Sequence, residues 1–138
     1  MSRVLEHHVK TLLAQHGVTV PASLVLDTKE NLGSVESTLG YPIVIKALVP
    51  AGKKARAGGV RVVAGREELT RAVSDLLGAV VGGYRVDRLL AEQFIEVDRE
   101  FFLSISYDSL RRGPRITLGS VGGVEIEALA RTGAGQRL

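Results

Sequence analysis

Cysteine and tryptophan are absent from this chain of 138 residues, and phenylalanine and tyrosine occur only three times each. Without cysteine the chain can have no structural disulfide, no thiolate metal site and no cysteine nucleophile, which is usual for a protein in a reducing compartment. The cytoplasm is therefore the expected location. So few aromatic side chains argue against a stacking platform for single-stranded nucleic acid.

Long hydrophobic runs are missing as well. No stretch approaches the roughly 20 apolar residues of a membrane span, and the polar start Met-Ser-Arg-Val-Leu-Glu-His-His is unlike a signal peptide. The 18 basic and 15 acidic residues leave a net charge of only +3, which is weak evidence for a nucleic-acid partner. Neither a membrane nor a nucleic acid is expected as a partner, and the length predicts one domain.

The most distinctive stretch present is a basic, glycine-containing loop between two β-branched segments, residues 43–46 and 60–63. Between residues 50 and 66 lie no acidic residues and these basic ones: Lys53, Lys54, Arg56, Arg61 and Arg66. Gly52, Gly58 and Gly59 let the backbone approach a ligand closely, so the loop suits a polyphosphate. An ordinary solvated hairpin fits the spacing equally well, because neither a Walker A pattern nor G-x-G-x-x-G opening a helix is present.

Apolar periodicity predicts helices near residues 3–16, from after Thr28 to Gly40, and over 67–77, the last with Glu67 and Glu68 in its first turn. Ser2 is the expected cap of the first helix, and Lys10 on it is expected to be a solvated charge. The histidines of this region, His7, His8 and His16, are assigned no chemistry.

Strands are predicted within 18–26, at 43–46 and from Val60, and then at 89–96, 100–107 and 115–120, the last three as an antiparallel meander. In the strand at 100–107, alternate side chains share a face that is expected to meet a core. That face consists of Phe101, Leu103, Ile105 and Tyr107.

Six ordered blocks resemble a known family: Val-Ile-Lys at 44–46, Pro-Ala-Gly at 50–52, Ala-Gly-Gly-Val-Arg-Val-Val at 57–63, Leu-Ala-Glu at 90–92, Arg-Glu-Phe-Phe-Leu-Ser-Ile at 99–105 and Ser-Val-Gly-Gly-Val-Glu-Ile-Glu at 120–127. Together they resemble the start of the ATP-grasp region of the succinyl-CoA synthetase β subunit, which ATP-citrate lyase and citryl-CoA synthetase share. The resemblance implies an α/β (α+β) fold that forms the N-terminal part of an ATP-grasp domain over residues 1–127. A small α/β subdomain is expected over about 1–85, a nucleotide-facing antiparallel sheet from 89 to 127, and a frayed tail at 128–138.

The resemblance also implies roles for particular residues. Lys46 would contact the nucleotide phosphates, and the backbone of Lys53, Lys54 and Ala55 would form a loop over them. The segment from Glu92 to Ile95 would lie at the adenine-binding hinge, and Glu100 would reach the ribose. For Glu92 and Glu100 the alternative is a surface salt bridge.

Two departures from the family pattern bear on this site. Lys53-Lys54-Ala55-Arg56 stands where the family has loops such as Gly-Gly-Arg-Gly-Lys; if the position of Ala55 needs a positive φ, its Cβ would cost on the order of 1 kcal/mol. The family's Mg²⁺-ligand segment and CoA-ligase domain have no counterpart in the chain, and Glu125 and Glu127 are only weak candidates for metal ligands.

The resemblance therefore implies the nucleotide-binding part of an ADP-forming acid–CoA ligase of tricarboxylic acid metabolism. ATP or GTP with Mg²⁺ would be the cofactor of the complete enzyme. The chain is expected to be inactive alone and to be completed by a second chain or a further C-terminal region. One alternative is a non-catalytic assembly or regulatory module derived from the ATP-grasp fold, and another is a polyanion-binding protein that uses the basic loop.

Overall fold

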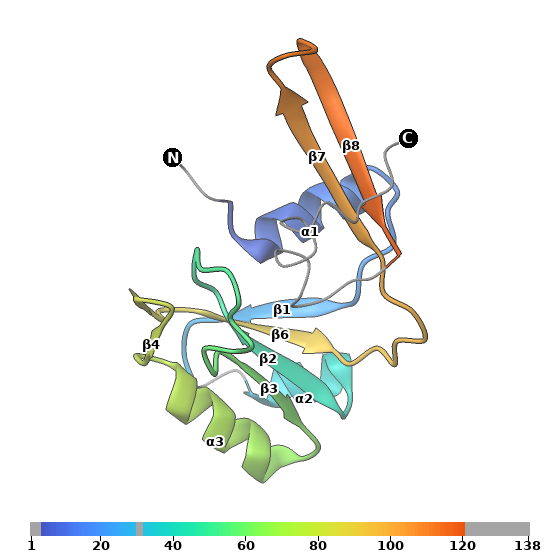
Figure 1. Cartoon of the computed structure of the whole chain (residues 1–138). Coiled ribbons are helices and arrows are strands. Elements are labelled where there is room, and N and C mark those ends of the chain that lie inside the picture. The colour runs from blue at the N-terminus through green and yellow to red at the C-terminus, as the bar shows by residue number, and fades with distance from the viewer. Residues whose placement is uncertain (1–3, 30–31, 121–138) are drawn as a thin grey trace. The chain divides into compact units, whose positions relative to one another are not determined.

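The computed structural model describes residues 4–29 and 32–120, and the chain divides into two compact units, 1–95 and 96–138. The first unit is built on a four-stranded antiparallel sheet in the order β1-β6-β2-β3, here called the main sheet (Figure 1). Its strands are β1 (Ser23–Leu26), β6 (Leu89–Gln93), β2 (Ile43–Ala47) and β3 (Val60–Val63).

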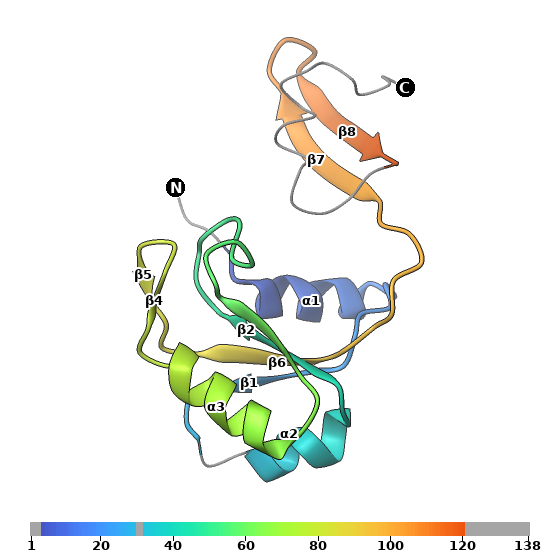
Figure 2. The same cartoon turned by 60° about the horizontal axis from the view of Figure 1, so that its bottom comes forward.

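Helices lie on both faces of the main sheet. α2 (Leu32–Leu39) and α3 (Arg66–Leu76) cover one face, and α1 (Glu6–Gln15) lies over the other (Figure 2). The hydrophobic core is on the side of α2 and α3, where alternate residues of β2 meet Leu69 and Val73 of α3. Because side chains alternate along a strand, the intervening Val44 and Lys46 point to the face under α1. No helix of the described residues is long and apolar enough to span a membrane.

The predicted helices are confirmed, with one correction at the start of the first. α1 begins at Glu6 with Leu5 at its cap position and no side-chain capping bond, so Ser2, which lies outside the described residues, is not the cap of the helix. Gly17 follows α1 with φ 78°, a conformation that favours glycine at a helix end. α3 buries the predicted apolar stripe, because its spacing of three and four residues keeps one face on the core.

The predicted meander is wrong for its first strand. β6 pairs with β1 and β2 in the main sheet, with Leu90 opposite both Val25 and Lys46. The pairing follows from composition, since Leu89 to Glu92 are buried on both faces and need a sheet interior. Only β7 (Phe102–Asp108) and β8 (Gly113–Gly119) form an antiparallel pair in the second unit.

The predicted alternation of side chains between the two faces of the β7–β8 hairpin is confirmed, but the predicted burial of its apolar face is wrong for the described residues. Leu103 opposes Leu118 and Ile105 opposes Ile116, so the apolar side chains do share one face. Those four side chains are 63%, 55%, 71% and 67% exposed. The expected core face is therefore uncovered in the described residues.

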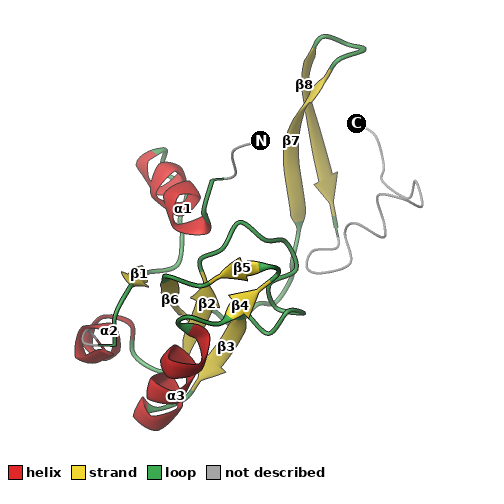
Figure 3. Cartoon of the chain, turned by 90° about the vertical axis from the view of Figure 1, so that its left-hand side faces the viewer, coloured by secondary structure: helices red, strands yellow, loops and turns green. Residues whose placement is uncertain are grey.

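A short hairpin that was not predicted connects α3 to β6. It consists of β4 (Val80–Val81) and β5 (Tyr84–Arg85), joined by Gly82 and Gly83, which both have positive φ (Figure 3). Strands of two residues carry too little pattern to be recognised in a sequence.

Candidate functional site

Five charged side chains meet on the face of the main sheet under α1, and we call them the lysine cluster: Glu6, Lys10, Lys46, Lys54 and Glu92. Glu6 and Lys10 come from α1, Lys46 from β2, Lys54 from the loop between β2 and β3, and Glu92 from β6. Three ammonium groups against two carboxylates leave one excess positive charge. The arrangement favours an anionic ligand.

The two carboxylates share the three lysines between them. Glu6 Oε1 accepts a hydrogen bond from Lys46 Nζ at 3.0 Å, and Glu6 Oε2 accepts one from Lys54 Nζ at 2.8 Å. Glu92 Oε1 accepts from Lys46 Nζ at 2.8 Å, and its other oxygen is ion-paired with Lys10. Lys46 is therefore held by both carboxylates, whereas Lys54 depends on Glu6.

Burial and charge act together on the ionisation of this cluster. Burial would raise the pKa of Glu6, but hydrogen bonds and positive charge from Lys54 and Lys46 outweigh it, and the pKa lies below the ordinary value for glutamate. Burial and the charge of Lys46 lower the pKa of Lys10, although Glu6 opposes them. Burial and the neighbouring charges together therefore set the ionisation of both Glu6 and Lys10.

The loop between β2 and β3 is fixed by close backbone approaches. Gly59 N donates to Lys54 O at 2.8 Å, and a Cβ on Gly59 would lie only 2.7 Å from Val81 Cγ1. A Cβ on Gly82 would lie 2.6 Å from the Cβ of Ala51. The β4–β5 hairpin therefore packs tightly against the loop, and this packing explains two of the glycines.

The positive backbone φ considered for Ala55 is found instead at Lys53, two residues earlier in the loop. Among the described residues, Lys53 and Arg112 are the non-glycines with positive φ, at 56° and 53°. Ala55 stands in a turn in which Ala57 N donates to Lys53 O and Gly58 N to Ala55 O. Its Cβ is therefore tolerated, and the amides of Lys54, Ala55 and Arg56 donate to no acceptor within the described residues.

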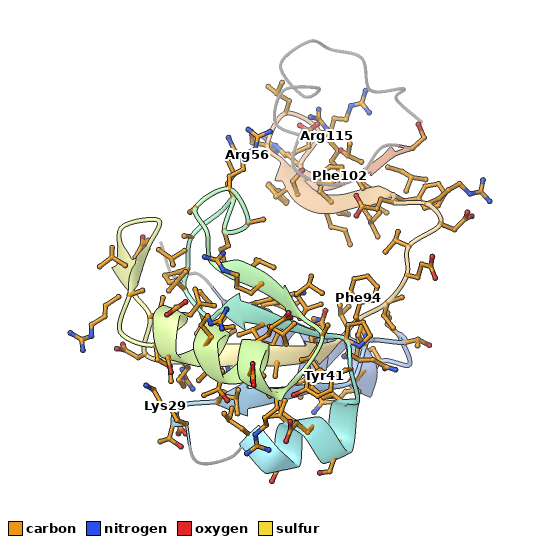
Figure 4. The ribbon with its side chains drawn as sticks, turned by 90° about the horizontal axis from the view of Figure 1, so that it is seen from below. Lys29, Tyr41, Arg56, Phe94, Phe102 and Arg115 are labelled. Atoms are coloured by element: carbon orange, nitrogen blue, oxygen red, sulfur yellow. The ribbon has the colours of Figure 1, made fainter. Side chains whose placement is uncertain are left out.

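The structure brings together only some of the predicted site residues. Lys46, Lys54 and Glu92 meet in the lysine cluster, whereas Lys53 and Ala55 lie exposed in the loop. Figure 4 shows Arg56 at the tip of this loop. Ile95 follows β6 and is 49% exposed. Glu100 is an exposed residue of the second unit.

Glu92 is ion-paired, as the alternative interpretation of this residue held, but it is not a surface residue. It is 6% exposed, because it lies on β6 between β1 and β2 and beneath α1. A carboxylate at this depth is tolerated only with charged partners, which Lys10 and Lys46 supply.

Sequence reasoning missed Glu6 and Lys10 as members of the site. Lys10 was expected to be solvated, yet its side chain is 16% exposed and ion-paired with Glu92. The available signal was the spacing of Glu6 and Lys10, which places opposite charges on one face of a helix. That spacing gives a helix face but not the sheet against which the face packs.

The histidines and carboxylates of the described residues form no group of three or more that could hold a metal ion. His7 is half-buried with its Nδ1 lacking a hydrogen-bond partner in the part of the chain that is described. Burial and the charges of His8 and Arg88 lower the pKa of His7. Glu125 and Glu127 lie outside the described residues.

Relatives of known sequence are β subunits of ADP-forming succinate–CoA ligases. The protein from Aquifex aeolicus is 35% identical over 133 residues, which are 91% of this chain and 34% of the relative. The protein from Thioalkalivibrio sulfidiphilus is 36% identical over 133 residues, again 91% of this chain and 34% of the relative. The chain thus spans about a third of the length of the curated relatives it matches.

Solved structures show the same fold. ACD1 of Ca. Korarchaeum cryptofilum in complex with coenzyme A has a TM-score of 0.76 and 25% identity, covering 92% of this chain and 56% of that one. ATP citrate lyase from Methanothrix soehngenii has a TM-score of 0.68 and 22% identity, covering 88% and 32%. A family profile described as an ATP-grasp domain matches residues 3–134. The mixed α/β fold and this match together show that the chain belongs to the ATP-grasp family.

Proposed function

We propose that this chain is the nucleotide-binding part of an ADP-forming acid–CoA ligase, with the lysine cluster and the adjoining loop as its phosphate site. The observation that carries the proposal is that Lys46 and Lys54, from two different segments, converge on one carboxylate at 3.0 and 2.8 Å. Two ammonium groups so placed already hold an anion. The phosphates of ATP or GTP are anions that the same donors would accept.

The loop adds backbone donors to these charges. The amides of Lys54, Ala55 and Arg56 belong to the start of one turn and are unused within the described residues. Successive amides of this kind form an anion-binding concavity. Lys53 immediately precedes these three residues. Its backbone φ of 56° is in the left-handed region, and the turn begins at this residue. Phosphate oxygens would then be bound by Lys46, Lys54 and this turn.

The adenine base would bind at the segment that follows β6. The side chain of Glu92 is ion-paired with Lys10 and Lys46, so the base would form hydrogen bonds with the backbone after Glu92 instead. Phe94 N donates to Pro42 O at 3.3 Å, while the backbone of Ile95 has no hydrogen-bond partner within the described residues. Ile95 would provide hydrogen bonds and apolar contact to the base, and Glu100 would accept hydrogen bonds from the ribose hydroxyls.

The complete activity would require more than this chain. The relatives are about three times longer, with 34% of their length matched, so we assign the second half of the grasp and the CoA-ligase domain to a partner chain or a further region. Mg²⁺ would accompany the nucleotide in the complete enzyme. The described residues do not offer a metal-ligand group, and we assign no Mg²⁺ ligand among them.

Calorimetric titration with ATP tests the phosphate site. Lys46→Ala should weaken binding at least about tenfold, because a charge held beside the phosphates is lost. Lys29→Ala is the matched control, since Lys29 is exposed and far from the loop tip in Figure 4, and it should change affinity less than about twofold. Equal binding by both variants and the native chain would remove Lys46 from the site. No binding by the native chain would contradict the proposed function.

A further inference from the structure

Hydrophobic burial contributes little to the attachment of α1. None of its residues is buried, and its apolar Val9, Leu12 and Leu13 are 41%, 55% and 40% exposed. The helix nevertheless lies over the face of the main sheet that carries Lys46, on the side opposite α2 and α3 (Figures 2 and 3). Another interaction must therefore hold it there.

Ion pairs from its first two turns provide that attachment. Glu6 is paired with Lys46 and Lys54, and Lys10 is paired with Glu92. The three partners are residues to which the proposed function gives a part in the nucleotide site. The helix is attached to the sheet through the binding residues themselves.

The carboxylate of Glu6 bridges the two lysines that the proposed function assigns to a phosphate. It gives one oxygen to each lysine, at 3.0 Å from Lys46 Nζ and 2.8 Å from Lys54 Nζ, which is how a phosphate bridges two ammonium groups. The side chain of Glu6 is 28% exposed, compared with 8% for Glu92. Glu6 is therefore the more exchangeable anion, while Glu92 can keep Lys46 in place.

Space for an incoming ligand adjoins this contact. A cavity of about 410 Å³ borders the Glu6–Lys54 pair, between the start of α1 and the basic loop. Its walls include Leu5 and Glu6 at the start of α1, and Gly52 and Lys54 of the loop. An anion in this cavity would reach Lys54 from the side of the loop.

We infer that Glu6 is a built-in competitor for the phosphate position, and that a nucleotide binds by displacing its carboxylate and loosening α1 from the main sheet. The inference rests on the proposed function, because it concerns the same lysines. Loss of the Glu6 ion pairs with Lys46 and Lys54 leaves the Lys10–Glu92 pair as the ion pair between α1 and the main sheet in the described residues. The nucleotide site is thus occupied by the chain's own carboxylate when no nucleotide is present.

Removing the charge of Glu6 tests the competition. Glu6→Gln should lower the dissociation constant of the full chain for ATP with Mg²⁺ about five- to tenfold, because the competing anion is gone while the side chain keeps its size. Glu67→Gln is the matched control, an exposed glutamate in the first turn of α3 with the same change of charge, and it should stay within about twofold. Unchanged affinity of Glu6→Gln overturns the inference. Weaker binding also overturns it, since Glu6 would then position the lysines for the ligand.

Hydrogen exchange of the full chain separates the inference from the proposed function. ATP and inorganic tripolyphosphate should each speed exchange of the α1 amides about threefold or more and slow exchange in residues 52–58, whereas adenosine should do neither. A slowed loop with unchanged or slower α1 overturns the inference and leaves the phosphate site standing. No slowing of the loop, with no heat of binding from native chain or Glu6→Gln, overturns both.

Discussion

Gly59 shows how a single missing side chain shapes the loop beside the phosphate site. A Cβ added at Gly59 would lie only 2.7 Å from Val81 Cγ1 and 3.2 Å from Lys54 O. The backbone there also joins the loop to the sheet, since Ala47 N donates to Gly59 O at 2.8 Å. Neither neighbour can retreat without disturbing the β4–β5 hairpin or the turn that presents Lys54.

Gly59→Ala should therefore destabilise the first unit by about 1–3 kcal/mol, the usual cost of overpacking. Gly52→Ala in the same loop is the control, because a Cβ there meets nothing within 4 Å. Chemical denaturation of both variants measures the difference. An equal unfolding midpoint for the two would show that the loop can move away from Val81 at no cost.

At the scale of elements, α1 and α3 are opposite kinds of helix. α3 buries Leu69, Ala72, Val73 and Leu76 against the core, whereas α1 buries none of its residues and is held by ion pairs. Apolar contacts resist salt and ion pairs near the surface do not. α3 is thus part of the stable scaffold, and α1 is the element that can respond to a ligand.

The contrast predicts unequal costs for the same substitution. Leu69→Ala should lower the free energy of unfolding by about 2–5 kcal/mol, because Leu69 is 0% exposed and a cavity would remain. Leu12→Ala on α1, at 55% exposure, should change it by no more than about 0.5 kcal/mol. Urea unfolding, monitored by circular dichroism, measures the free energy of unfolding of both variants. Comparable losses in the two variants would mean that α1 is packed as firmly as α3.

At the scale of the whole molecule, the two units of the chain differ in how far their apolar side chains are buried. The first has a closed core between the main sheet and its two covering helices. The second presents an apolar hairpin face with Ile105 at 71% and Ile116 at 67% exposure. Within residues 4–29 and 32–120 this apolar face has no covering segment, whereas the core of the first unit is closed.

The chain by itself should make no CoA thioester from ATP, Mg²⁺, CoA and a di- or tricarboxylic acid. Phosphoryl transfer needs metal ions bridging the phosphates and an acceptor held in line. The six blocks that resemble the family do not include its metal-ligand segment, and the described residues offer no group of three or more metal ligands. Incubation with radiolabelled ATP, with and without a candidate partner chain, measures the product. Thioester formed without a partner would show that residues other than those named here carry the chemistry.

The sequence by itself was sufficient for the three helices, for the longer strands and for the family. Leu69, Val73 and Leu76 follow a helical period, the three residues 43–45 are β-branched, and Gly17 and Gly78 stand at helix ends with positive φ. Such signals are local, because helix and strand periods depend on residues only a few positions apart. The basic loop and its likeness to the ATP-grasp family were visible for the same reason.

Only the tertiary structure decided which segments meet. β6 could have joined β7, and it pairs instead with β1 and β2, because a strand buried on both faces gains most from a central position. That pairing places Glu92 beneath Lys10 and Lys46, and the docking of α1 brings Glu6 onto Lys46 and Lys54. The contacts of the lysine cluster between α1 and the sheet join residues about 40 or more positions apart, such as Glu6 and Lys46. No period or spacing in a sequence records a contact over that distance, since it depends on how whole elements pack.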